Sequence, residues 1–307
     1  MANTFLTPQV IAQAALATLY ETTVAAQLVH RDYSPEFVAK VGDTVNVRKP
    51  AVFEAQEFAD GGSIDLQDAT EGNVPVVLNH HADVSFSVTT KDLSLKIEDF
   101  AAQLLDPAME AISQKIDRDV LSFRNDITAE VGSGTGDYTS LYTAADSLVD
   151  AGTVLDIANV PVTERRVIVG PKTKGAWLKD PLLQRADQSG STAALRQANF
   201  GGFLFGFDPY MSQNIGQPAA NPAAGQPTTE VNVGFHRTAV ALVTRQLELP
   251  LGAQNAAIEG YKGFGIRVVY DYDIKSKKDI VSLDVLYGVK TLDPARAVLI
   301  KGADKAA

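Results

Sequence analysis

The sequence predicts an α+β protein, and three observations lead to that prediction. Residues 145–212 alternate between helical and strand patterns. Residues 97–128 repeat apolar side chains at helical spacing, whereas residues 42–92 and 264–290 contain stretches with the period-two alternation of strands. At 307 residues the chain is long for one simple core and suits one to three domains.

The composition is that of an ordinary folded protein and excludes several classes of function. Apolar residues make up 45% of the chain and charged residues 21%. The chain has no cysteine, so neither disulfides nor thiolate metal sites contribute. The net charge of -10 disfavours a protein whose main task is gripping nucleic acid, although a wall around DNA stays compatible with it. We find no signal peptide and no membrane-spanning stretch, so we expect a soluble protein.

Residues 1–41 begin with a candidate amphipathic helix. Thr7 and Pro8 are the residue types of an N-cap followed by the first helical position, and apolar residues then recur at helical spacing. We interpret residues 1–41 as an N-terminal arm. Two roles stay open for this arm: docking on its own domain, or reaching a neighbouring subunit.

Residues 42–92 change character and predict a long β-hairpin. Residues 43–48 and 76–88 alternate like strands, and Gly61-Gly62 lies near the middle of the polar stretch between them. A two-stranded ribbon that packs on nothing is at best marginally stable in water. We therefore expect the surface of another protein to complete this hairpin.

The predicted tip of the hairpin is strongly acidic. The stretch from Phe53 to Glu71 has no lysine or arginine. Its six acidic residues are Glu54, Glu57, Asp60, Asp65, Asp68 and Glu71. This charge either keeps a solvated loop soluble or complements a basic patch on a neighbouring molecule, where it would fix register more than affinity.

A long helix is expected after the hairpin. Between Ile97 and Thr128, apolar residues recur at helical spacing, and a helix of that length would span ~48 Å. Pro107 interrupts the pattern. Because Asp106 and Pro107 together can begin a new helix, we expect a break or a kink there.

The order of short motifs in residues 145–212 is the most specific signal in the chain. It predicts a helix, a buried strand, a Gly-Pro stop, a second helix, a polar loop, a glycine-rich turn and an aromatic strand. The motifs are Ala145-Asp-Ser-Leu148, Asn159-Val-Pro161, Arg165-Arg-Val-Ile-Val-Gly-Pro171, Ala176-Trp-Leu178, Asp180-Pro181 and Gly201-Gly-Phe-Leu-Phe-Gly-Phe-Asp-Pro-Tyr210. After them we expect an exposed loop over residues 213–229, a strand and helix over 231–249, and a β-rich end.

This order of motifs resembles the axial domain of the major capsid (coat) proteins of tailed bacteriophages, which have the Hong Kong 97-type fold. The resemblance covers nearly the whole chain and is most specific in residues 145–212 and 264–298. It implies an N-terminal arm (1–41), an extended loop (42–92), a peripheral domain with a long spine helix (93–136), an axial domain (137–255) and C-terminal strands that complete both domains (256–307).

The resemblance implies a structural function. We expect pentamers and hexamers of this chain to build an icosahedral shell around double-stranded DNA, in a virion assembled in the cytoplasm of the bacterial host. A portal, a separate scaffolding protein and a decoration protein are the further partners it suggests, with no membrane. The alternative is a cargo-enclosing nanocompartment of the same fold. An enzyme of unknown type is the third hypothesis, and it has no positive support.

The resemblance also suggests where the acidic tip binds. In this family the extended loop crosses the peripheral domain of the adjacent subunit, so the expected cationic partners are Lys115, Arg118 and Arg124 of the spine helix. The turn with Lys275, Lys277 and Lys278 is a second choice. Some family members cross-link a loop lysine to a neighbour's asparagine, but the basic residues near this loop (Arg48, Lys49 and Lys91) all lie at its base. We therefore expect a non-covalent shell.

Motifs for catalysis, cofactors or metals are weak. His80 and His81 are adjacent in a predicted strand, so their side chains point to opposite faces and cannot chelate one ion together. The glycines of residues 132–136 lack the lysine of a P-loop, and those of residues 201–206 have the wrong spacing for a dinucleotide fingerprint. We expect no catalytic, cofactor-binding or metal-binding residue.

Overall fold

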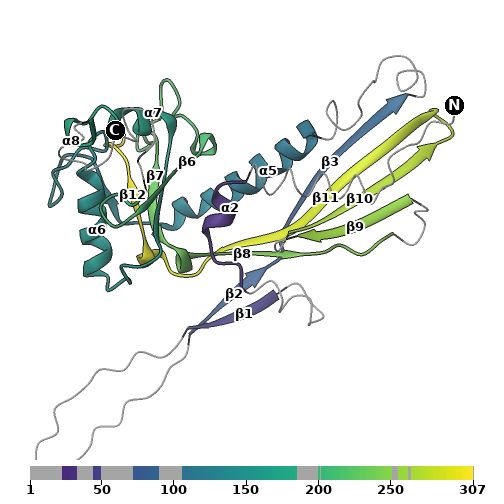
Figure 1. The fold of residues 1–307 in the computed structure, drawn as a ribbon, viewed down its shortest axis with the longest axis horizontal. Coiled ribbons are helices and arrows are strands. Elements are labelled where there is room, and N and C mark those ends of the chain that lie inside the picture. Colours follow the sequence, from purple (N-terminus) through teal and green to yellow (C-terminus); the bar gives the residue numbers. More distant parts are fainter. Residues whose placement is uncertain are drawn as a thin grey trace, which may run out of the picture.

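The computed structural model describes residues 23–32, 44–49, 72–89, 106–184, 200, 202–250, 255–261 and 264–306. They form two lobes, each built on a five-stranded sheet, and a two-stranded ribbon that leaves the joint between them (Figure 1). We call these the peripheral lobe, the axial lobe and the ribbon, and define each by its strands.

The peripheral lobe is an antiparallel sheet in the order β3-β11-β10-β9, in which β8 also pairs with β11. Its strands are β3 (His80–Thr89), β8 (Val240–Arg245), β9 (Asn255–Tyr261), β10 (Phe264–Asp273) and β11 (Lys278–Thr291). The predicted alternation is present, because Val281, Leu283 and Val285 of β11 are fully buried on one face. β11 pairs with β3, β8 and β10 and therefore holds the sheet of this lobe together.

Helix α5 (Asp106–Leu121) runs along the peripheral lobe towards the axial lobe (Figure 1). One face is buried, through Met109, Ile112, Ile116 and Val120. The described part of the helix has Pro107 as its second residue and tightens into the 3-10 turn η2 (Ser122–Asp126). The expected break or kink at Pro107 stays a prediction, because the residues before Asp106 lie outside the described residues. The predicted helical residues 97–105 lie outside the described residues. Among the helices that the structure describes, none is long and apolar enough to cross a membrane.

The axial lobe is a mixed sheet in the order β4-β12-β7-β5-β6. Its strands are β4 (Glu130–Val131), β5 (Arg165–Val169), β6 (Asp208–Met211), β7 (Asn232–His236) and β12 (Ala297–Ile300). The outer pairs β4–β12 and β5–β6 are parallel, and β7 is antiparallel to both of its neighbours.

The axial sheet is covered on both faces, and its strands β7 and β12 are buried along their whole length. Helices α6 (Ser147–Ile157), α7 (Pro171–Trp177) and α8 (Pro181–Gln184) contribute to one cluster, with Val167 and Val169 of β5. Ile168, between those valines, belongs instead to the core that α5 shares. The order helix, buried strand, Gly-Pro stop and helix predicted for residues 145–177 is confirmed.

The ribbon consists of β1 (Thr44–Lys49) and β2 (Gly72–Val77), an antiparallel pair. The prediction that residues 76–88 form one strand of the hairpin is wrong. β2 ends at Val77, and after a break β3 pairs with β11 of the peripheral lobe along its whole length. A glycine explains the crossing: any Cβ on Gly288 of β11 would collide with the carbonyl oxygen of Val77.

Strand β8 corrects a second expectation, because residues 231–249 are not a strand and helix. They form β7, the 3-10 turn η4 (Arg237–Ala239) and β8. Residues 240–244 are buried on both faces: Val240 and Leu242 enter the core shared with α5, while Ala241 and Val243 pack against the ribbon. A continuous apolar run fits a strand buried on two sides, and length alone separates it from a short helix.

Candidate assembly interface

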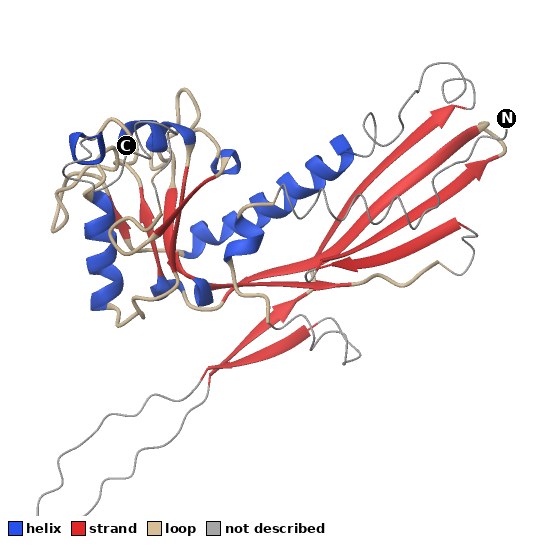
Figure 2. Cartoon of the chain, in the orientation of Figure 1, coloured by secondary structure: helices blue, strands red, loops and turns tan. Residues whose placement is uncertain are grey.

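The six acidic residues of the predicted tip fall in a part of the chain that the structure does not describe. Glu54, Glu57, Asp60, Asp65, Asp68 and Glu71 all lie in residues 50–71, outside the described residues. The structure does describe the two strands that lead to them. Figure 2 shows that the ribbon points away from both lobes.

The base of the ribbon is anchored on its own chain, so the expectation of a ribbon packed on nothing is wrong. Val45, Val47 and Val76 are buried in a small cluster with Ala241 and Val243 of β8. The residues that alternate with the valines of β1, namely Thr44, Asn46 and Arg48, are exposed. The described part of the ribbon therefore has one face packed on β8 and one exposed face.

The outward face of α5 carries two of the three predicted cations. Lys115 and Arg118 are exposed. Lys115 Nζ lies 3.0 Å from Asp119 Oδ2, one helical turn away, and an Arg118 Nη2 to Gln114 Oε1 contact spans 3.5 Å. Such exposed pairs on one helix contribute little, on the order of 0.3–0.5 kcal/mol. Lys115 and Arg118 can therefore exchange these partners for others at small cost.

Arg124, the third predicted cation, is engaged within the chain. Its guanidinium donates to the backbone oxygens of Leu121 at 2.9 Å, Ile215 at 3.2 Å and Val231 at 2.8 Å. Burial lowers the pKa of this side chain below its usual range. Arg124 thus ties the end of α5 to the axial lobe, and the sequence alone does not separate it from the exposed cations.

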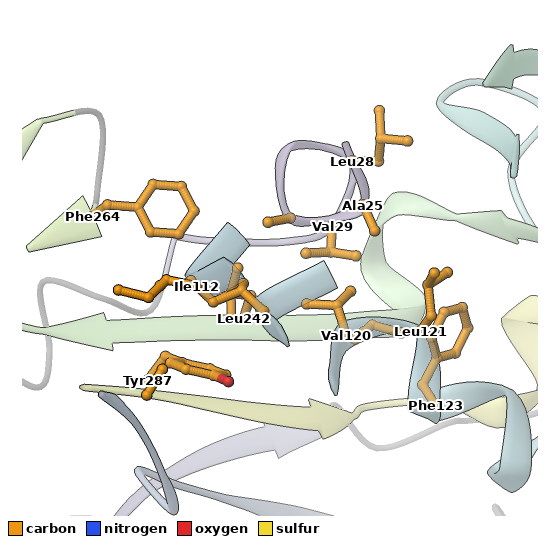
Figure 3. Packing of buried hydrophobic residues seen from close by; sticks show 14 of the residues in the cluster. Ala25, Leu28, Val29, Ile112, Val120, Leu121, Phe123, Leu242, Phe264 and Tyr287 are labelled. Atoms are coloured by element: carbon orange, nitrogen blue, oxygen red, sulfur yellow. The ribbon is translucent and has the colours of Figure 1, made fainter. Parts of the chain in front are cut away.

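Residues 23–32 form a strap across the joint, and sequence analysis gave no sign of its anchors. Its helical turn α2 (Ala25–Leu28) has no capping side chain of its own. Asp117 of α5 takes that part, accepting from the backbone N–H of Val24 at 2.9 Å and of Ala26 at 3.2 Å. Figure 3 shows Ala25, Leu28 and Val29 of the strap packed over buried side chains of α5 and β8.

The carboxylate of Asp117 is almost fully buried. Burial raises its pKa, although backbone N–H groups of the strap donate to it. A charged residue on a helix face that also carries Ile112 and Ile116 was the available signal. Its meaning depends on which segment crosses that face, and periodicity does not tell this.

The strap also connects the two lobes. The Arg166 guanidinium of β5 donates to the carbonyl oxygen of Leu28, and the backbone of His30 pairs with Val240 and Leu242 of β8. Asp32 lies 3.5 Å from Arg237 Nη2, which in turn faces Glu164 at 3.4 Å from Nη1. The strap therefore binds the axial lobe, the peripheral lobe and α5 at the same joint.

His80 and His81 lie on opposite sides of β3, as predicted. The His80 ring stacks on Tyr287 with centroids 5.3 Å apart, and its Nδ1 is 3.6 Å from Asp119 Oδ2. His81 Nε2 instead faces Asp284 Oδ1 at 3.8 Å. Over the described residues, no group of three or more His, Cys, Asp or Glu side chains could hold a metal ion.

An open groove of about 640 Å³ lies where the axial lobe meets the end of α5. Its walls include Arg124, Gln217, Glu130, Lys301 and Asp304. The Lys301 ammonium lies 2.9 Å from Glu130 and 2.7 Å from Asp304, and with Arg124 the lining has two cations for these two acids. The groove therefore presents no unbalanced charge of these residues to a ligand.

Comparisons with known proteins show which family and which solved structures this chain is similar to. The sequence model of a family described as phage capsid protein matches residues 83–280. No curated protein matches the chain. A solved structure from Mycobacterium phage Che8 superposes with a TM-score of 0.68 at 23% identity, covering 90% of each chain. The capsid of Cyanophage P-SCSP1u gives 0.59 at 14% identity, covering 86% of this chain and 85% of that one. A virus-like particle from Pyrococcus furiosus gives 0.52 at 13% identity, covering 95% and 97%.

Proposed function

Because the chain belongs to the phage capsid protein family, whose model matches residues 83–280, we propose that it is a major capsid protein that forms the pentamers and hexamers of an icosahedral shell around double-stranded phage DNA. The α+β Hong Kong 97-type fold predicted from the sequence is confirmed by the likeness to solved capsids. The protein is a capsid shell protein and its place is the virion.

The observation that carries the proposal is the ribbon. It is held at its base by β8 and has one exposed face, which would let a subunit reach a neighbour. Shell contacts repeated between identical copies need such a projecting element and a surface that receives it. We place assembly in the bacterial cytoplasm, with a portal and a scaffolding protein as partners and no catalytic activity of the chain itself. A decoration protein would bind the finished shell.

Imaging of the expressed protein tests this function. Negative-stain micrographs and sizing near neutral pH should show capsomers, shells or polymorphic assemblies, and particles from infected cells should contain double-stranded DNA. A well-behaved 33 kDa monomer under all these conditions would count against the proposal. Shells that hold a protein cargo and no DNA would favour the alternative, a cargo-enclosing nanocompartment.

We further propose that the acidic tip binds Lys115 and Arg118 of the adjacent subunit. Both cations are exposed, and their present partners lie on the same helix. Arg124 is assigned a different part, because its three backbone hydrogen bonds hold it inside its own chain. One exposed ion pair contributes only ~0.2–1 kcal/mol, but a shell repeats the contact in every subunit.

A charge swap tests this contact. Glu54→Lys with Glu57→Lys should impair assembly, and adding Lys115→Glu with Arg118→Glu should partly restore it. The matched control adds Lys275→Glu with Lys277→Glu instead, which changes the same charge in the β10–β11 turn. Assembly of the loop variant at wild-type yield in low salt would mean that the acids only keep the loop soluble. Rescue by the control would move the contact to that turn.

A further inference from the structure

A strained turn precedes β6 in the axial lobe. The backbone N–H groups of Leu204 and Phe207 each donate to the other's oxygen at 2.9 Å, which closes a two-residue hairpin turn. The two central residues, Phe205 and Gly206, have φ of 48° and 85°. Positive φ at both positions defines a type I′ turn, whose first position favours Asn, Asp or Gly. A phenylalanine there is strained, because its Cβ crowds the backbone in this region.

The turn holds two aromatic side chains in solvent. Phe203 is 68% exposed and Phe205 40%, whereas Leu204 and Phe207 are buried beneath them. Phe207 is fixed between α6 and β7, since a Cβ on Gly152 would lie 3.8 Å from its ring and one on Gly234 3.3 Å. The exposed rings therefore stand on a rigid base. Strain that persists at an exposed aromatic position points to a function of that residue.

The same lobe exposes a second apolar surface on α6. Val149, Thr153 and Ile157 are four residues apart and share the outward face of the helix, while the inward face packs on the axial sheet. Ile157 is 70% exposed, and Val162 in the loop after α6 is 66% exposed. The outward face of a surface helix is normally polar. We call residues 149, 153, 157 and 162 the α6 stripe.

We propose that this turn docks on a second copy of the chain, where the α6 stripe receives Phe203 and Phe205. The inference rests on the proposed function, because a shell places every axial lobe beside others. A contact that joins identical subunits into a closed ring uses two different surfaces, so each copy must carry both halves. The axial lobe carries two such halves, one a projecting aromatic turn and the other an exposed aliphatic stripe.

The strain favours a second copy over a free surface. If the turn faced only solvent, an asparagine or glycine at position 205 would stabilise it, and removal of the phenyl ring would cost no contact. A rigid turn with two aromatic side chains has the composition and the fixed geometry that concentrate binding energy at interfaces. The role of the turn is therefore to present these two rings to a partner, although the strain lowers the stability of the subunit itself.

Phe205→Asn separates the two effects. It places Asn before Gly206, the preferred pair for this turn, and it removes the ring. The thermal midpoint of the unassembled fraction should equal or exceed that of the wild-type protein. The yield of shells at equal protein concentration should fall about tenfold or more, as for loss of an aromatic interface anchor. Phe205→Tyr keeps the ring and should assemble normally.

Ile157→Ser tests the receiving surface. It should lower the shell yield in the same direction without lowering the thermal midpoint, because the side chain is exposed in the subunit. Leu249→Ser is the matched control, since Leu249 is also exposed and lies in neither surface. Phe203→Ser repeats the test if Phe205→Asn does not give soluble protein.

The outcomes are distinguishable. Wild-type protein that forms no shell overturns the proposed function, and this inference with it. Wild-type shells together with normal shells of Phe205→Asn overturn this inference alone. A lower thermal midpoint for Phe205→Asn would mean that the ring serves the subunit's own fold, which also overturns it. Loss of assembly with the turn variants but not with Ile157→Ser would assign the turn to a different partner surface and refute the α6 stripe.

Discussion

The axial lobe and the ribbon use similar strand residues but reach stability differently. Val167, Ile168 and Val169 of β5 are fully buried, because helices cover one face of the sheet and α5 the other. In the ribbon, Val45 and Val47 are buried on β8, while the residues that alternate with them are exposed. Strand β5 of the axial lobe is therefore buried on both faces within its own chain, whereas the described strands of the ribbon are buried on one face only.

We propose that this difference separates the parts of the subunit that stabilise its own fold from the parts that contact other subunits. A two-stranded pair gains independent stability only from packing on other elements. The ribbon receives that packing from Ala241 and Val243, and the other face of its described strands is exposed. We infer that changes in the axial core damage every subunit, whereas changes in the ribbon act mainly on contacts between subunits.

The largest effect is expected in the axial core. Trp177 is fully buried, and its Nε1 donates to the backbone carbonyl oxygen of Tyr142 at 2.8 Å. Trp177→Ala should therefore cost about 3–5 kcal/mol of the unfolding free energy of the unassembled subunit. Val47→Ala in the ribbon should cost no more than about 2 kcal/mol, since it removes less buried surface. Chemical denaturation monitored by circular dichroism measures both.

The contrast is open to refutation in either direction. A ribbon variant that unfolds the subunit as strongly as Trp177→Ala would show that the ribbon is part of the folding core. Val47→Ala should instead show its main effect as a lower yield of assembled particles.

Patterns that depend on neighbours in the chain were predictable from the sequence. The order of elements in residues 145–177 and the helix over Asp106–Leu121 follow from local chemistry, namely a Gly-Pro stop and helical spacing. The exposed cations Lys115 and Arg118 were also identified, because a helix places them opposite its apolar face.

Features that depend on distant segments were not predictable in this way. Alternation continues through residues 76–88, so it does not reveal that β2 and β3 belong to different sheets. The glycine at 288 was the available sign of a close approach, but not of which strand crosses there. The same holds for Arg124 and Asp117, whose partners lie about a hundred residues away in the chain. The acidic tip remains a prediction, because it lies outside the described residues.

The crossing at Gly288 gives the next largest effect. Gly288→Val would force a side chain against the Val77 carbonyl, and the backbone must shift, which typically costs about 1–3 kcal/mol. Because the strain falls between the ribbon and the sheet, we expect the mutation to accelerate amide exchange more in β2 than in β7. Gly175→Ala is the control, since a Cβ there meets nothing within 4 Å. Uniform exchange across both lobes would contradict this placement of the strain.

A smaller effect concerns acid stability of the axial lobe. Burial alone would raise the pKa of Glu230, but hydrogen bonds from Thr173, Gln217 and Lys172 outweigh it and hold the pKa below its ordinary value of 4.5. The folded chain thus binds this proton less readily than the unfolded chain. The stabilisation is present above pH 4.5 and is lost as the pH falls through the folded-state pKa.

Glu230→Gln tests this sign. It should cost about 1 kcal/mol at neutral pH, the usual net contribution of one hydrogen bond, and should reduce the dependence of the thermal midpoint on pH below 4.5. Because Glu230 holds the axial lobe and not the ribbon, the amide exchange rate in β2 should be the same in Glu230→Gln as in the wild-type protein. An unchanged pH dependence would show that other carboxylates control acid unfolding.

The last prediction is that no covalent bond forms between subunits through the acidic tip. Residues 50–71 contain no lysine, so no side-chain amine is available there to attack an asparagine of a neighbour. The ribbon must then be held by packing and by charge, which are reversible, and the charge part weakens as salt rises. Particles boiled in denaturant should run as single subunits of 32.8 kDa on a gel. A ladder of multiples would place a reactive amine elsewhere, with Lys49 and Lys91 as the first positions to replace by arginine. If those two variants removed the ladder, the base of the loop rather than its tip would carry the bond, and the ribbon would join the subunit's permanent structure after assembly.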